Sequence, residues 1–247
     1  MKKLKFFATL FFRLINKLIG YYGFVLSKPE VIHGSPAFMG SALLSRKILQ
    51  FKTYYNAVHD IDGDVVEAGI HWGYGLVAHL HNDNANRKIF AFDSFEGHSS
   101  AHENDKKSSN WFNLSSLFKV SIEDVHKTLN FSGFPLEVYK DKIVFIAGWA
   151  QSTMPQFNQS NKISLVHCDM DIYEPVLITL KSFWPLLQIG GIIVVGRLNN
   201  PELMGKTNAF NEFVNSLNLE EYKIDVIKTR EINTFKLLDE TFIQKIK

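Results

Sequence analysis

The sequence predicts an α/β domain with a doubly wound, mostly parallel sheet. Short apolar stretches with the composition of buried strands, such as residues 64–68 and 162–168, alternate along the chain with stretches of helical period. A length of 247 residues fits one such domain with additional elements, and 46% hydrophobic residues suffice for a large core. We therefore expect helices on both faces of one sheet, preceded by an N-terminal helical extension.

The composition excludes several classes of protein. The formal net charge is only +2, which argues against a dedicated nucleic-acid binder. Cys168 is the only cysteine, so the chain can form neither a disulfide framework nor a cysteine zinc cluster. We expect a cytoplasmic protein, because a single cysteine suits a reducing compartment, and we expect Cys168 to lie in the core.

Residues 1–26 are basic and apolar, and they precede a helical lead-in at residues 27–62 and the main domain at residues 63–247. The longest uncharged run near the start, residues 6–12, is too short to span a bilayer, and no good signal-peptide cleavage site follows it. As a helix, the first segment would have a narrow polar stripe and a wide apolar face. Such a helix would lie on the inner face of an anionic membrane, or it would pack on this domain or on a second subunit of a homo-oligomer.

The remaining elements follow from periodicity and from turn residues. Residues 41–58 carry apolar residues at close to the helical period, and further helices are expected after Ser121, at residues 175–188 and at residues 205–217. Strands are expected at residues 64–68, 88–93, 142–148, 162–168 and 192–195, with two closing strands in residues 222–238. Residues 94–116 are long and polar, so we expect a lid or a binding loop there.

A glycine-rich turn after the first strand marks a predicted ligand site. Gly69, Gly73 and Gly75 allow a sharp turn and a close approach of a ligand to the backbone, and Glu67 is expected to point its carboxylate into the crevice. The spacing is not that of a dinucleotide fold, and the tyrosine–lysine pair of short-chain dehydrogenases is missing from the sequence. An acid two residues before the first glycine fits S-adenosylmethionine, whose ammonium group a carboxylate can neutralise. The alternative is a tight turn without a ligand.

Acidic residues also follow two other predicted strands. Asp93 ends the second strand about 20 residues beyond the turn, where nucleotide-type folds place a ribose-binding carboxylate. Asp169 and Asp171 follow the fourth strand, and such a pair can bind a divalent metal or supply a general base. The pair also resembles the nucleotide-sugar site of glycosyltransferases, and two helix-capping acids are a further alternative. We expect His167 to point to the opposite side from Asp169.

Between roughly residues 60 and 215, several ordered motifs resemble the macrocin O-methyltransferase family. The motifs lie at residues 63–69, 92–97, 148–155, 169–173, 190–195 and 205–213. Members of this family methylate sugar hydroxyls with S-adenosylmethionine, on a Rossmann-like class I methyltransferase fold. The resemblance therefore implies an O-methyltransferase whose small-molecule or glycan acceptor is a saccharide or glycoside.

The resemblance also implies a role for each matched position. Glu67 and Gly69 would face the methionine part of the donor, Asp93 the ribose, and residues 149–153 the adenine, with Gly73, Ser94, Trp149 and Gln151 among the cofactor-binding residues. Asp169 falls where the family has a magnesium ligand, and Asp171 where it has the general base. A sugar hydroxyl is a poor nucleophile until its proton is withdrawn, so a base beside the methyl group is required.

One departure from the family pattern concerns the metal site. The family carries an Asp-Asp pair after the fifth strand, and this chain has Gly196 and Arg197 there. We expect Arg197 to replace the Mg²⁺ ion by pairing with Asp169, which would make methyl transfer metal-independent with Asp171 as the base. Two alternatives stay open. Either the site is inactive and the protein binds its ligand as a partner module, or Asn199 completes a weak metal site.

Overall fold

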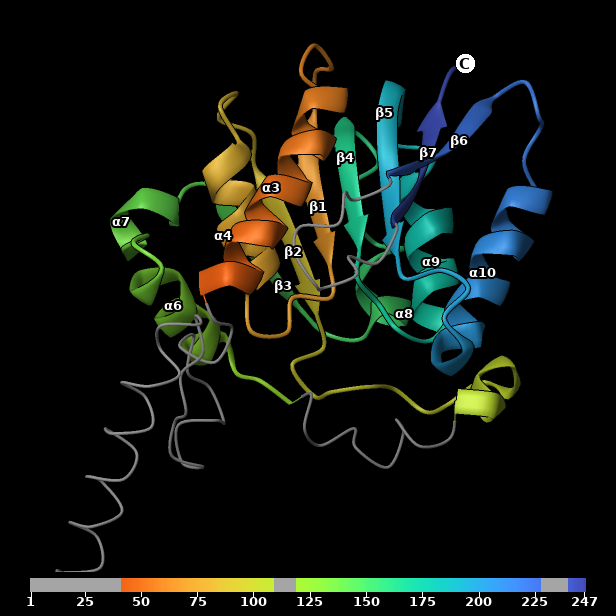
Figure 1. Ribbon diagram of the computed structural model, residues 1–247, viewed down its shortest axis with the longest axis horizontal. Helices are drawn as coiled ribbons and strands as arrows, with labels where there is room; N and C mark the ends of the chain where they lie inside the picture. Colours follow the sequence, from red (N-terminus) through yellow and green to blue (C-terminus); the bar gives the residue numbers. More distant parts are fainter. Residues whose placement is uncertain (1–40, 109–118, 228–239) are drawn as a thin grey trace, which may run out of the picture.

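The computed structural model describes residues 41–108, 119–227 and 240–247, and in this part of the chain one seven-stranded sheet has the order β3-β2-β1-β4-β5-β7-β6 (Figure 1). The parallel strands are β1 (Asp64–Ala68), β2 (Ile89–Asp93), β3 (Ile143–Ala147), β4 (Ile163–Cys168) and β5 (Leu187–Gly196). The strands β7 (Glu240–Lys245) and β6 (Tyr222–Ile227) complete the sheet in antiparallel orientation. The predicted α/β fold with a mostly parallel sheet is confirmed. The predicted basic segment at residues 1–26 lies outside the described residues.

Helices cover both faces of this sheet (Figure 1). One layer contains α3 (Ser41–Ala57), α4 (Tyr74–Asn82), α6 (Ile122–Phe131) and α7 (Leu136–Tyr139), and the other contains α8 (Ala150–Thr153), α9 (Tyr173–Phe183) and α10 (Met204–Asn215). Two 3-10 helices, η3 (Glu103–Ser108) and η5 (Pro201–Leu203), lie in the loops after β2 and β5. The helix predicted after Ser121 is present as α6, and Ser121 and Asp124 form a capping box at its start. Among the described helices, none is both long and apolar enough to cross a membrane.

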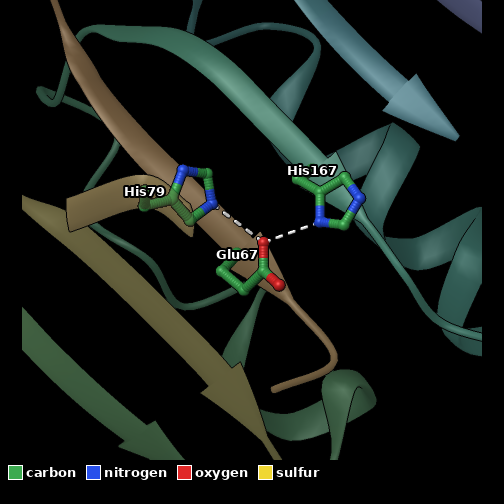
Figure 2. A group of neighbouring side chains, drawn as sticks. All are labelled: Glu67, His79 and His167. Atoms are coloured by element: carbon green, nitrogen blue, oxygen red, sulfur yellow. Dashed lines mark hydrogen bonds and ion pairs between the residues drawn. The ribbon is translucent and has the colours of Figure 1, made fainter. Parts of the chain in front are cut away.

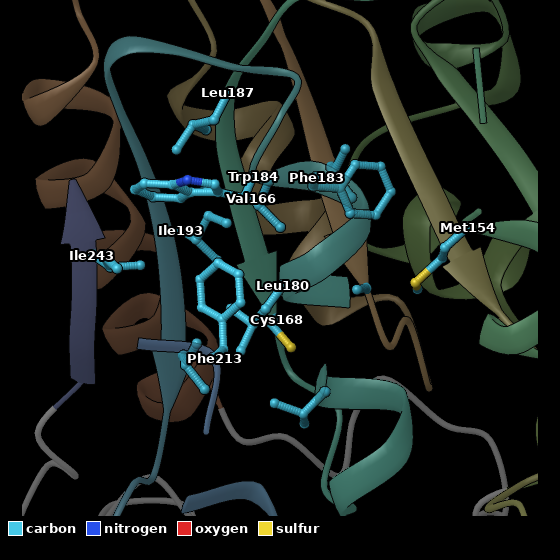
Figure 3. Close-up of a cluster of buried hydrophobic side chains, with 14 of the residues drawn as sticks. Met154, Val166, Cys168, Leu180, Phe183, Trp184, Leu187, Ile193, Phe213 and Ile243 are labelled. Atoms are coloured by element: carbon cyan, nitrogen blue, oxygen red, sulfur yellow. The ribbon is translucent and has the colours of Figure 1, made fainter. Parts of the chain in front are cut away.

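Successive side chains of each strand point to opposite faces of the sheet, so the core has two halves, one on each face. Val65 and Leu165 pack on the side of α3 and α4, whereas Val166 and Ile193 pack on the side of α9 and α10 (Figure 3). Each of these side chains is fully buried, which stabilises the fold by about 1.5–3 kcal/mol per residue. Cys168 lies in the second half, as predicted, and burial raises the pKa of its thiol to about 11.

Helix α3 is part of this core. Phe51 and Tyr54 on α3 and Val58 just after it are completely buried, and the helix packs on α4 and reaches β5. The lead-in that the sequence separates from the main domain therefore contributes a helix to the same core. Because α3 lies over β1 and β4, it brings Lys47 to the carboxyl end of β4.

Two element boundaries differ from the prediction. Helix α9 ends at Phe183, several residues early, because Pro185 follows and has no N–H group with which to continue the helical hydrogen bonds. The last strand, β7, comes after the predicted range 222–238 and lies between β5 and β6. Ile243 in β7 is fully buried. The position of this strand is therefore determined by its pairing with β5, and not by a local sequence pattern.

The loops after β1, β2, β4 and β5 lie at the carboxyl edge of the parallel strands, where open α/β sheets bind ligands. Positive φ angles occur in these loops at His71, Phe95, Arg197 and Asn199, with values of 48°, 57°, 60° and 62°. Such conformations cost about 1–3 kcal/mol each and persist only where the surrounding structure holds them. They concentrate at functional sites, so this edge is the candidate site.

Candidate functional site

At each glycine of the turn after β1, close packing explains why the residue has no side chain. Gly73 precedes α4 with a φ angle of 84°, and a β-carbon there would lie 2.8 Å from Cγ1 of Val125. Gly69 packs against the backbone of Asp169 at the end of β4. A β-carbon on Gly75 would collide with the carboxylate of Glu67. The three glycines therefore allow β1, α4 and the end of β4 to approach one another closely.

Glu67 lies in the core rather than in the crevice (Figure 2). Its oxygen Oε2 accepts a hydrogen bond from Nε2 of His79 at 2.9 Å and another from Nδ1 of His167 at 2.7 Å. The Tyr55 hydroxyl in turn donates to Nδ1 of His79 at 3.0 Å. The expected orientation of Glu67 toward the crevice is wrong, because helices α3 and α4 enclose its carboxylate, which is 1% exposed.

The position of His167 also corrects the prediction. His167 pairs in register with Glu67, and Asp169 contacts Lys47 of α3, so His167 and Asp169 face the same layer of helices. Residues two apart on a strand project to the same side, and β4 keeps this alternation past its last residue. The two acids of the edge, Glu67 and Asp169, are therefore on one side of the sheet at different depths.

The Glu67 group is electrostatically satisfied. Burial alone would raise the pKa of Glu67, but the charge and hydrogen bond of His167, together with those of His79, lower it to about 2. Burial lowers the pKa of His79, which keeps its imidazole neutral near pH 7. Ligand atoms of the three side chains lie within 4.8 Å of one another, yet both imidazole N–H groups donate to one carboxylate oxygen. This arrangement needs no cation.

Asp93 ends β2 and joins two loops. Its Oδ2 accepts the backbone N–H groups of Ile70 at 2.8 Å and His71 at 3.0 Å, and its Oδ1 accepts that of Phe95 at 2.8 Å. The hydroxyl of the neighbouring Ser94 donates within the same turn. The carboxylate thus holds the glycine turn against the loop after β2. Its contact with a ribose, and the contact of Ser94 with a cofactor, stay predictions.

Trp149 and Gln151 lie at the start of α8, after β3. Trp149 is 38% exposed as a whole residue, and its flat apolar ring is of a kind that a ligand can stack on. Nε2 of Gln151 donates to Glu174 at 3.0 Å, and its buried carbonyl oxygen has no hydrogen-bond partner among the described residues. A buried acceptor without a partner is costly, and the exocyclic amine of an adenine would satisfy it. The predicted adenine contact stays a prediction.

Asp169 and Asp171 are held by three cations from three different elements. Nη2 of Arg197 donates to Oδ1 of Asp169 at 3.1 Å and to Oδ1 of Asp171 at 2.6 Å. Lys47 of α3 donates to Oδ2 of Asp169 at 3.4 Å, and Lys206 of α10 donates to Oδ1 of Asp171 at 3.3 Å. The expected pairing of Arg197 with Asp169 is present, and the bond to Asp171 adds to it.

Asp169 and its partners Lys47 and Arg197 stay charged over the physiological pH range. Burial would raise the pKa of Asp169, but the charges of Lys47 and Arg197 lower it well below its usual value. The same carboxylate raises the pKa of Lys47 and, together with Asp171, that of Arg197, in both cases against the effect of burial. Lys206 is completely buried and also donates to the carbonyl of Gly196 at 3.2 Å.

The loop after β2 returns to this edge. Asp105 in η3 is 1% exposed, and its two oxygens accept the N–H groups of Tyr173 and His102, each at 3.0 Å. The rings of His102 and Tyr173 stack with centroids 4.4 Å apart. Burial lowers the pKa of His98, although the charge of Asp171 acts in the opposite direction. The described part of the predicted binding loop is thus anchored at the start of α9, with His98 in the field of Asp171.

Sequence reasoning did not single out Lys206, Lys47 or His79. Lys206 lies in the motif at residues 205–213, which was the available signal for it. Lys47 and His79 stand on helices at positions that carry no local signal. Their roles become visible only when α3 and α4 pack on the sheet.

A family model described as macrocin-O-methyltransferase (TylF) matches residues 34–229 of this chain. The chain belongs to the macrocin O-methyltransferase family. Among similar proteins, 8-demethyl-8-(2,3-dimethoxy-alpha-L-rhamnosyl)-tetracenomycin-C 4'-O-methyltransferase of Streptomyces olivaceus is 28% identical over 145 residues, which are 55% of this chain and 52% of that protein. Demethyldecarbamoylnovobiocin O-methyltransferase of Streptomyces niveus is 27% identical over 146 residues, or 56% and 53% of the two chains. This macrocin O-methyltransferase family member thus spans about half the length of these relatives.

Solved structures of methyltransferases share its fold. The O-methyltransferase NovP superposes with a TM-score of 0.68 at 19% identity and covers 97% of this chain and 100% of its own. The calicheamicin methyltransferase CalS11 superposes with a TM-score of 0.65 at 19% identity and covers 96% and 91% of the two chains. The family member therefore has the Rossmann-like class I methyltransferase fold that the motifs implied.

The free energy of unfolding is expected to fall as the pH drops below about 6.5, the usual pKa of histidine. Folding lowers the pKa of His79, so the unfolded chain binds a proton there at a higher pH than the folded chain does, and acid favours unfolding. Urea titrations at several pH values measure this slope. His79→Gln should reduce the slope, whereas His59→Gln, at an exposed position, should leave it unchanged. An unchanged slope in His79→Gln would contradict the prediction.

Gly75→Ala is expected to lower the free energy of unfolding by about 1–3 kcal/mol, despite the better helix propensity of alanine. The added methyl group would displace the Glu67 carboxylate from its two histidines. Gly133→Ala is the control, because nothing lies within 4 Å of a β-carbon there and only its φ angle of 90° opposes alanine. Calorimetric melting compares the two variants. Unchanged stability of Gly75→Ala would refute the steric role of Gly75, whereas a loss in Gly133→Ala reports only the cost of its φ angle.

Proposed function

We propose that this chain is an S-adenosylmethionine-dependent O-methyltransferase that acts on a hydroxyl group of a saccharide or glycoside. The carboxylate of Asp171 carries this proposal, since Arg197 and Lys206 hold it at the carboxyl edge of the sheet, near the glycine turn. Membership of the family supports the reaction class. The names of the two Streptomyces relatives refer to a rhamnosyl-tetracenomycin and to a novobiocin derivative, which supports a sugar-bearing small molecule as the acceptor.

The methyl donor would lie across the loops that follow β1, β2 and β3. In this arrangement Gly69 and Gly73 line the methionine part, Asp93 and Ser94 lie at the ribose, and Trp149 and Gln151 lie at the adenine. The exposure of Trp149 and the unpartnered carbonyl oxygen of Gln151 support the adenine position. Glu67 acts from behind the turn, because its enclosed carboxylate shapes α4 rather than meeting the donor.

The proposed reaction is a direct displacement at the methyl carbon. The donor supplies a methyl group activated by the positive sulfonium. The acceptor hydroxyl passes its proton to Oδ2 of Asp171 while its oxygen bonds to the methyl carbon, and the electron pair of the broken carbon–sulfur bond goes to sulfur. The products are a methyl ether and S-adenosylhomocysteine. The protein contributes the base and the alignment of oxygen, carbon and sulfur in one line.

One other function has a specific observation in its favour. Arg197 stands where the family has an acid, which is compatible with a relative that binds ligand without transferring methyl groups. A glycosyltransferase that uses Asp169 and Asp171 is disfavoured by the family membership. Peripheral membrane contact through residues 1–26, a cytoplasmic location and a homo-oligomeric state are further proposals.

The full-length protein is expected to bind S-adenosylhomocysteine, and Asp93→Asn is expected to weaken this binding by about tenfold, or about 1.4 kcal/mol. The amide keeps one acceptor oxygen for the backbone but removes the negative charge that strengthens a bond from a ribose hydroxyl. Isothermal titration calorimetry measures both affinities. Asp62→Asn is the control, because Asp62 is exposed and pairs with Lys162 at the surface. Absence of binding to folded wild-type protein would refute the proposed donor site, and so would an affinity of Asp93→Asn equal to that of wild type.

Asp171→Asn is expected to reduce methyl transfer by about 10²–10⁴-fold, the usual contribution of a general base, and to leave the affinity for S-adenosylhomocysteine unchanged. A screen of nucleotide sugars and glycosides, read by the mass of an added methyl group, identifies the acceptor for this comparison. Donor binding without transfer to any acceptor would favour the inactive relative. Glycosyl transfer in the same screen would favour the glycosyltransferase, and full activity of Asp171→Asn would assign the base elsewhere.

A further inference from the structure

Five charged side chains alternate in sign across the carboxyl edge of the sheet. In order of contact they are Lys47, Asp169, Arg197, Asp171 and Lys206. They come from α3, from the ends of β4 and β5, and from α10, so the two layers of helices meet in one chain of ion pairs. Three positive and two negative charges leave this group with a net charge of +1.

The group does not fit the magnesium ion that the family resemblance implies. Mg²⁺ requires near-octahedral oxygen ligands at about 2.0–2.1 Å. Here a single atom, Nη2 of Arg197, lies 3.1 Å from Oδ1 of Asp169 and 2.6 Å from Oδ1 of Asp171. The other oxygen of Asp169 faces Lys47, so a divalent ion would enter among three positive charges.

We propose that the guanidinium of Arg197 occupies the position of the divalent cation and excludes such an ion, so that methyl transfer at this site needs no metal. The second half of this statement rests on the proposed function, and the first half does not. Arginine suits this position because its charge is permanent and its planar donors can reach two carboxylates at once. It therefore joins Asp169 to Asp171 through one shared donor group.

Lys47 and Lys206 hold this arrangement at its two ends. Lys206 is completely buried and donates both to Asp171 and to the carbonyl of Gly196, the residue before Arg197. Lys47 binds the oxygen of Asp169 that Arg197 does not use. Each carboxylate is thus bound by two cations, and Arg197 is the cation that they share.

The backbone at Arg197 makes one substitution especially informative. Its φ angle of 60° lies in the left-handed region, which aspartate and asparagine tolerate better than most side chains. Arg197→Asp is therefore compatible with the local conformation. It removes the shared cation and places a third carboxylate beside Asp169 and Asp171, which is the type of ligand set that Mg²⁺ and Mn²⁺ prefer.

Titration of the full-length protein with Mn²⁺, followed by electron paramagnetic resonance, tests the exclusion without an acceptor or a donor. Wild-type protein is expected to bind no Mn²⁺ at this site, and Arg197→Asp is expected to bind about one ion per chain. Lys162→Asp is the matched control, because it creates an acidic pair with Asp62 at the exposed surface and reports on non-specific binding. Arg197→Asn serves as a neutral variant of the same backbone if the aspartate variant does not fold, and it is expected to bind Mn²⁺ more tightly than wild type.

One Mn²⁺ bound per wild-type chain, lost in Asp169→Asn, would overturn the inference. So would the absence of Mn²⁺ binding in both folded Arg197 variants, because exclusion would then not be the work of the arginine. Once an acceptor is known, wild-type turnover should be unchanged by EDTA, and EDTA-sensitive turnover would refute metal independence. Failure to bind S-adenosylhomocysteine would instead count against the proposed function while leaving the Mn²⁺ result valid.

Discussion

The enclosed carboxylate of Glu67 constrains the arrangement of β1, β4 and α4. An unpaired charge in the core would cost several kcal/mol, so the chain supplies a donor from β4 in His167 and one from α4 in His79. The carboxylate also occupies the space where any side chain larger than hydrogen at residue 75 would lie. The glycine turn follows from this contact, since α4 must pass directly over the end of β1. The shape of the candidate donor site therefore depends on a group that the donor need not touch.

Parallel strands bring the rest of the site together. Their carboxyl ends share one edge, so the loops after β1, β2 and β5 can be joined by short-range contacts. Asp93 binds backbone groups of the first two loops, and Arg197 joins the end of β5 to the end of β4. The positive φ angles at His71, Phe95 and Arg197 are held by these contacts. Rigid strands and bound loops together give the polar groups defined positions.

The molecule pairs its acids in two different ways. Glu67 is deep in the core and is bound by imidazoles, whereas Asp169 and Asp171 are partly exposed and are bound by arginine and lysine. A guanidinium is attached to the chain and cannot exchange with solvent, so its position is set when the protein folds. The geometry of the proposed base would then be independent of the concentration of divalent ions.

The sequence by itself determined the fold class, most strands, the acids at the strand ends and the meeting of Arg197 with Asp169. The fold class, the strands and the acids depend on local periodicity and on the rule that parallel strands end at one edge, whereas the pairing of Arg197 was expected from the departure from the family's metal site. Only the tertiary structure decided that Glu67 is enclosed, that Lys47 reaches Asp169, and that β7 enters the sheet beside β5. Strand alternation says that a side chain faces one side of the sheet, but not which helix covers that side or how deeply. The covering helix and the depth of burial depend on how distant segments of the chain pack together. No local pattern in this sequence predicts that packing.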